Sequence, residues 1–81
     1  MNKEHKNYFV IEQLVEENEI EKIENDIVFI NSVEDDNGDM STPFNVDLNT
    51  LTVYANGYYN DPSGIYTERY FQNKIIEMKP F

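Results

Sequence analysis

The carboxylates of residues 12–39 are the side chains of this chain whose density and spacing could support chemistry. This window holds eleven acids and one base, Lys22, whereas the remaining residues hold five of each, so the whole net charge of −10 lies in the window. Dense carboxylates can bind hard cations, act as general acids and bases, or present a negative field to a basic partner. The eleven are Glu12, Glu16, Glu17, Glu19, Glu21, Glu24, Asp26, Glu34, Asp35, Asp36 and Asp39.

A helix over residues 9–24 would arrange six of these acids in two rows. Residues three and four apart on a helix lie about 5–6 Å from one another, and DNA carries one charge per about 3.4 Å of axis on each strand. Two such rows, together with the acidic turn at 35–39, would therefore imitate the phosphate array of a nucleic acid. The rows are Glu12, Glu16 and Glu19 on one side and Glu17, Glu21 and Glu24 on the other.

The run Asp35-Asp36-Asn37-Gly38-Asp39 also suggests a calcium-binding loop. If Gly38 takes the sixth position of an EF-hand loop, Val33 falls on the first position and Phe44 on the twelfth, where the two anchoring ligands are needed. Both anchors are missing. We therefore expect a turn here, and no metal site.

Other reactive residue types are scarce. The chain has no cysteine, and His5 is its single histidine, in a polar segment without a second ligand or triad partner. Ser32, Ser41 and Ser63 lack a nucleophile motif, and no glycine-rich phosphate loop occurs. We expect no catalytic residue and no cofactor, and hence a protein that is not an enzyme.

Tyrosines and phenylalanines are concentrated in the second half of the chain. Aromatic side chains stack on nucleic-acid bases only beside a cationic groove, and the chain beyond residue 47 has no net charge. Most of these rings are expected to pack in the core and across strands. The alternative is an apolar hot spot for a protein partner, formed by Tyr58, Tyr59 and Tyr66.

The elements that must position these residues indicate an α+β fold. We expect a polar tail at 1–7 and a single small acidic domain at 8–81. An acidic helical segment at its N-terminal end precedes a small antiparallel sheet, a meander of three or four short strands. The expected strands are 26–33, 40–46 and 49–55, and residues 65–78 form either a helix or two short strands.

Two details of this scheme stay open. The apolar residues at 10–15 follow one helical face, but Ile20 and Ile23 project nearly opposite to it. Residues 8–25 are therefore one helix, a helix broken near Asn18, or partly strand. Pro43 favours an edge or bulge position for its strand.

Charge, size and composition together favour a binding protein. In size and acidity the chain resembles the small phage proteins that inhibit host DNA-handling proteins by imitating DNA, a resemblance of class that covers no aligned motif. Its many Asn, Ile and Lys residues indicate an AT-rich genome, such as that of a low-GC bacterium or its phage. The resemblance implies a basic nucleic-acid-binding partner, such as a nucleoid protein, a polymerase, a glycosylase or a nuclease.

Two other functions fit the same composition. One is an immunity or antitoxin protein that binds a basic toxin. The other is a small structural or oligomer-forming protein, for example a homodimer, with no charge-driven partner. The sequence contains no apolar run long enough for a signal peptide or a membrane span, so we expect a cytoplasmic protein without a membrane partner.

The net charge predicts that the protein itself does not bind DNA or RNA. Attraction to phosphates supplies most non-specific affinity for nucleic acids, and a charge of −10 opposes it. A mobility-shift assay at physiological salt should show no complex with duplex or single strands. Binding at micromolar concentration would contradict the proposed imitation of nucleic acid.

Overall fold

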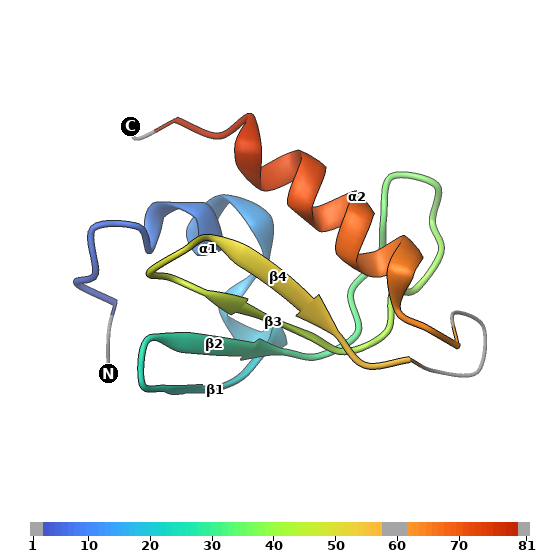
Figure 1. Cartoon of the computed structure of the whole chain (residues 1–81), viewed down its shortest axis with the longest axis horizontal. Coiled ribbons are helices and arrows are strands. Elements are labelled where there is room, and N and C mark those ends of the chain that lie inside the picture. Colours follow the sequence, from blue (N-terminus) through green and yellow to red (C-terminus); the bar gives the residue numbers. More distant parts are fainter. Residues whose placement is uncertain (1–2, 58–61, 80–81) are drawn as a thin grey trace.

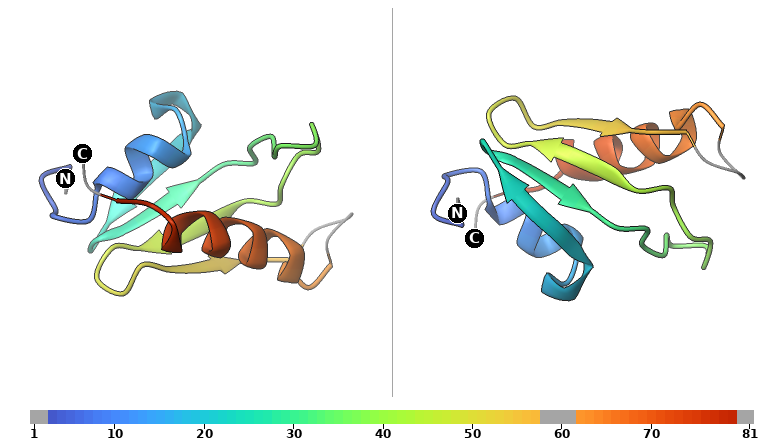
Figure 2. Two further views of the ribbon diagram at one scale, coloured as in Figure 1. Left: turned by 90° about the horizontal axis from the view of Figure 1, so that it is seen from above. Right: turned by 90° about the horizontal axis from the view of Figure 1, so that it is seen from below.

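Four strands and two helices form two layers in the computed structural model, which describes residues 3–57 and 62–79 (Figure 1). The strands pair antiparallel in the order β1-β2-β3-β4. Both helices lie on the same face of the sheet (Figure 2), which confirms the α+β class. The elements are α1 (Phe9–Leu14), a 3-10 turn η1 (Glu17–Glu19), β1 (Ile20–Glu24), β2 (Ile27–Ile30), β3 (Phe44–Asp47), β4 (Thr52–Ala55) and α2 (Ile65–Ile76).

Of the alternatives left open for residues 8–25, one continuous helix does not form, and the segment is partly strand. Helix α1 ends at Leu14, and Val15 is extended, with φ −140° and ψ 162°. Ile20 and Ile23 would have pointed away from the apolar face of a longer helix, whereas from β1 both pack against the core. Their burial outweighs the helical preference of the surrounding glutamates. The two helical rows of carboxylates therefore do not exist.

Strands β1 and β2 form a hairpin that the sequence analysis missed. Asn25 and Asp26 have φ values of 51° and 63°, the left-handed conformation required at both central positions of a type I′ turn. Asparagine and aspartate tolerate this conformation better than other non-glycine residues. The expected strand 26–33 therefore begins one residue late, at Ile27, and ends at Ile30.

Strand β3 lies in the middle of the sheet, so the edge or bulge position inferred from Pro43 is wrong. Pro43 immediately precedes the first residue of β3, Phe44. Its missing N–H therefore falls outside the ladder, and it costs no hydrogen bond of the sheet.

Helix α2 settles the open interpretation of residues 65–78 in favour of a helix, and its side chains close the β4 edge. Gln72 Oε1 accepts a hydrogen bond from Val53 N at 2.9 Å, and Gln72 Nε2 donates to Leu51 O at 2.8 Å. Glu68 Oε2 accepts from Ala55 N at 3.1 Å. These bonds satisfy backbone groups that an edge strand leaves unpaired.

The N-terminal residues expected as a polar tail make contacts with the β3–β4 connection. Asn7 Nδ2 donates to Leu48 O at 2.7 Å, and His5 Nε2 lies 3.0 Å from Asn49 Oδ1. Tyr8 N donates to His5 O at 2.9 Å, which begins the approach to α1. Within 3–57 and 62–79, no helix is long and apolar enough to cross a membrane.

Two phenylalanines couple the layers. The rings of Phe44 on β3 and Phe71 on α2 are stacked with centroids 4.3 Å apart, and both are buried. Phe29 lies half-buried in the alternate register of β2, between the buried Val28 and Ile30. It therefore points to the sheet face opposite the helices.

Truncation of Phe44 and of Phe29 should lower the stability of the protein by different amounts, because Phe44 is buried and Phe29 is only half-buried. Phe44→Ala should lower the free energy of unfolding by about 3–5 kcal/mol, because it leaves a cavity beneath Phe71. Phe29→Ala should cost less than half as much, since part of that ring already faces water. Urea unfolding followed by circular dichroism measures both, and equal losses would contradict the assignment of the two faces.

Candidate functional site

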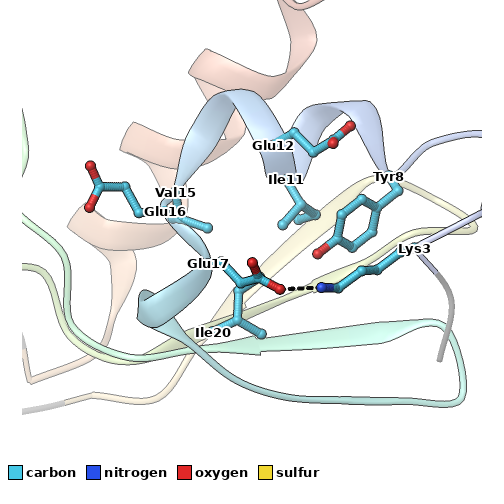
Figure 3. Close-up of a pocket in the computed structure, with 8 residues that line it drawn as sticks. All are labelled: Lys3, Tyr8, Ile11, Glu12, Val15, Glu16, Glu17 and Ile20. Carbon is cyan, nitrogen blue, oxygen red and sulfur yellow. Dashed lines mark hydrogen bonds and ion pairs between the residues drawn. The ribbon is translucent and has the colours of Figure 1, made fainter.

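A groove of about 420 Å³ lies between Lys3, helix α1 and the segment that leads into β1 (Figure 3). Its floor is apolar and continues the core, whereas its rim carries three carboxylates. A cavity of this kind suits a ligand that has both an apolar part and a positive charge. The floor residues are Tyr8, Ile11, Val15 and Ile20, and the rim residues are Glu12, Glu16 and Glu17.

The end of α1 creates this groove. Val15 N donates to Ile11 O at 3.0 Å, the last bond before the chain turns into η1. Glu19 then holds η1, because its Oε1 accepts from Glu16 N at 2.8 Å while its own N donates to Glu16 O at 2.9 Å. The turn places Glu16 and Glu17 beside the floor and commits the Glu19 carboxylate to the backbone.

Lys3 spans the groove and forms an ion pair with Glu17. The hydrogen bond between them raises the pKa of Lys3 and lowers the pKa of Glu17. The Glu17 side chain is nevertheless 78% exposed. It can therefore be reached by a second cation from outside.

Tyr8 is the polar member of the floor. It is only 6% exposed, and its hydroxyl has no hydrogen-bond partner among residues 3–57 and 62–79. No fully buried side-chain oxygen in those residues lacks a partner, so this hydroxyl must open into the groove. Figure 3 shows it directed toward the space beside Lys3. Burial raises the pKa of Tyr8, and Lys3 nearby acts in the opposite direction.

The acidic loop at 35–39 differs from the groove, because the carboxylate of Asp35 accepts hydrogen bonds from the backbone of the loop itself. Asp35 is 9% exposed and accepts hydrogen bonds from Asn37 N at 2.8 Å and Asp39 N at 2.9 Å. The Tyr66 hydroxyl donates to its second oxygen at 2.8 Å. These bonds lower the pKa of Asp35, with the bond from the Asp39 backbone the largest cause.

Helix α2 binds the same loop at two further points. Lys74 Nζ lies 3.2 Å from Asp36, and this contact lowers the pKa of Asp36. The Tyr70 hydroxyl accepts a hydrogen bond from Asp36 N at 2.8 Å. Tyr66 and Tyr70 are stacked beside the loop. Tyr66, one of the three tyrosines expected as an apolar hot spot, therefore binds the acidic loop. The other two, Tyr58 and Tyr59, lie outside the described residues.

The structure separates the eleven acids into two groups. The first group is carried by the continuous segment from α1 to the β1–β2 turn, and the second by the 34–39 loop, which lies beside α2 (Figure 1). Lys22 approaches Glu24 to 3.7 Å. The first group is Glu12, Glu16, Glu17, Glu19, Glu21 and Glu24, followed by Asp26 in the turn, and the second is Glu34, Asp35, Asp36 and Asp39.

Sequence reasoning missed Lys3 and Tyr8 as residues of the site. The spacing of Tyr8, Ile11 and Val15, three and four apart, does predict a shared helical face. No local pattern connects Lys3 to Glu17, because fourteen residues separate them. Across residues 3–57 and 62–79, no three His, Cys, Asp or Glu side chains converge in a group that could hold a metal ion.

Comparisons with protein-family models, with curated proteins and with solved structures found no significant match.

The Asp35 network predicts a pH-dependent contribution to stability. Its folded pKa lies below the ordinary carboxyl value of about 3.9. The contribution is therefore fully present above that value and is lost as the pH falls through the folded pKa. Asp35→Asn should destabilise the protein most near neutral pH, and the difference from the wild type should shrink under acid.

Urea unfolding between pH 7 and pH 3, both rough limits around the carboxyl range, measures this difference. Asp39→Asn is the matched control, because it removes one charge from the same loop and leaves the Asp39 backbone bonds to Asp35 in place. A loss for Asp35→Asn that is constant over the pH range would refute the assigned role.

Proposed function

We propose that this protein is a non-enzymatic acidic inhibitor or modulator that blocks the nucleic-acid-binding surface of a basic protein by imitating nucleic-acid charge. One observation carries the proposal, an acidic flank that follows the chain from α1 to β1. Lys22 within this segment and Lys3 beside it are each already paired with a flank glutamate. The acidic flank consists of Glu12, Glu16, Glu17, Glu19, Glu21 and Glu24, all exposed except the half-buried Glu19.

Competition for phosphate sites is the mechanism that this surface supports. The carboxylates of the acidic flank take positions that phosphates would take on the partner, and the field of the whole protein steers a basic partner toward them. Asp26 and the loop acids extend the field. Asp35 and Asp36 contribute less to direct contact, because Tyr66 and Lys74 already hold them.

The partner has a basic surface that binds phosphates. Nucleoid proteins, polymerases, glycosylases and nucleases all meet that description. A cytoplasmic location and an origin in a phage or a low-GC bacterium go with this proposal, because such partners are present where nucleic acid is handled.

A displacement assay tests the proposed function. A fluorescent DNA duplex is bound to one purified bacterial protein from each of the four classes, and this protein is added at rising concentration. Displacement from at least one class, weakened as salt rises, is expected because exposed charges are screened over about 8 Å at physiological ionic strength. Retention of the duplex by all four proteins at low salt would refute the proposal for these classes.

Neutralising the acidic flank should abolish displacement without unfolding the protein. The variant is Glu12→Gln, Glu16→Gln, Glu19→Gln and Glu24→Gln, which keeps side-chain shape and removes four charges. Its stability should stay level or rise, because surface changes are usually within about 0.5 kcal/mol each and self-repulsion falls. The concentration needed for half displacement should rise at least about tenfold, which corresponds to about 1.4 kcal/mol of binding free energy.

A matched variant removes four charges elsewhere, by Glu4→Gln, Glu34→Gln, Asp39→Asn and Glu77→Gln. It makes the net charge less negative by the same amount but leaves the acidic flank intact, so it should displace DNA nearly as well as the wild type. Equal weakening of the two variants would show that net charge alone acts, and that the flank is no specific surface.

A further inference from the structure

The groove contains a polar group that nothing within 3–57 and 62–79 satisfies. Tyr8 is 6% exposed, yet its hydroxyl neither donates nor accepts a hydrogen bond there. A hydroxyl that no protein group satisfies keeps its hydrogen-bonding capacity for whatever enters the space in front of it. Its opening into the groove therefore marks a place where a ligand group would gain a hydrogen bond.

The other groups of the groove define the chemistry of that ligand. Ile11, Val15 and Ile20 offer an apolar floor, Glu17 faces Lys3 across it, and Glu12 and Glu16 are the other acidic residues of the lining (Figure 3). A long side chain with an apolar stem and a cationic head matches both features, because such a stem packs on apolar surface while its charge stays at the rim.

We infer that the groove receives one arginine side chain of the basic partner, with its guanidinium between the Glu17 carboxylate and the Tyr8 hydroxyl. The inference rests on the proposed function, since it names the group by which the groove holds that partner. The guanidinium donates to both oxygens, and its stem lies along Ile11 and Val15.

Arginine fits better than lysine because a lysine already occupies the rim. The Lys3 ammonium pairs with Glu17 and leaves the Tyr8 hydroxyl without a partner. A guanidinium has five N–H donors spread over a planar fork, so it reaches two separated acceptors more readily than the compact ammonium, which at Lys3 pairs with Glu17. The partner's arginine thus does what Lys3 does and satisfies Tyr8 in addition.

Lys3 is accordingly an internal competitor for the groove. It comes from a different part of the chain than Glu17, and its side chain is 42% exposed. An incoming arginine must take the Glu17 carboxylate from it. Removal of the Lys3 charge should therefore strengthen binding of the arginine, although it removes an ion pair from the folded protein.

A blocked pentapeptide with one arginine between glycine pairs is the probe. Its binding is followed by shifts of the protein's amide NMR signals, and the same peptides with lysine or with citrulline, the neutral isostere, are controls. The arginine peptide should shift signals of residues that line the groove and bind at least about three times more tightly than the lysine peptide. The citrulline peptide should bind far more weakly than either.

Three variants locate the arginine. Glu17→Gln should weaken the arginine peptide about tenfold, and Tyr8→Phe about fivefold, because each removes a charge-assisted bond. Lys3→Gln should tighten it about threefold or more, since the competitor is gone. Tyr8→Phe should leave lysine binding unchanged, a result that a general loss of structure would not produce.

Matched controls remove the same charges outside the groove. Glu21→Gln and Lys22→Gln, both on β1, should change the affinity for the arginine peptide by less than about twofold, because exposed charges at a distance are screened. Melting curves of every variant exclude unfolding as the cause. If Glu21→Gln acts as strongly as Glu17→Gln, or if shifts spread over the whole acidic flank, the groove is no arginine site.

The displacement assay separates this inference from the proposed function. If the wild type displaces DNA but Tyr8→Phe and Glu17→Gln do so equally well, the function stands and the arginine site is refuted. If the groove binds the arginine peptide but no DNA is displaced, the site stands and its assignment to a nucleic-acid-binding partner is overturned.

Discussion

The stacking of Phe71 on Phe44 is the contact on which the arrangement of the two layers depends. The ring centroids lie 4.3 Å apart and join α2 to the central strand β3. Because the sheet buries one face, helix α2 has to lie on that face, and α1 covers the part that α2 leaves open (Figure 2). Helices from the two ends of the chain thereby share one core, as a domain of this length needs, since it buries roughly 60% of its unfolded surface.

The acidic residues occupy the positions that this core does not need. On β1, Glu21 and Glu24 are exposed to water, while Ile20 and Ile23 pack against the core. The charges are thus spread over a helix end, a bulged strand and a loop, which limits their mutual repulsion. The groove arises where these two regions meet, with a floor that continues the core and a rim that begins the acidic flank.

Local patterns in the sequence predicted the sheet better than they predicted the site. The alternation of apolar and polar residues in 49–55 predicts β4, because successive side chains of a strand point to opposite faces of the sheet. The positions of Ile20 and Ile23, nearly opposite to the apolar face of residues 10–15, already argued against one helix over 9–24. Helix α2 contributes Glu68 and Gln72 to the β4 edge, and no local pattern in 65–78 reveals these contacts. The pairing of Lys3 with Glu17 is likewise a product of the fold, and only the tertiary structure places both beside Tyr8.

The closed β4 edge leaves β1 as the edge of the described sheet where a strand of a second molecule could pair. Helix α2 already uses the outward backbone groups of Val53 and Ala55, so a strand from a second molecule cannot be added there. Fibril assembly by strand addition would have to start at β1. A bulge between Ile20 and Lys22 distorts that edge, and the neighbouring glutamates repel an identical strand. Glu21 and Glu24 of the acidic flank would therefore oppose the addition of an identical strand at β1, and protonation of these carboxylates would weaken that opposition.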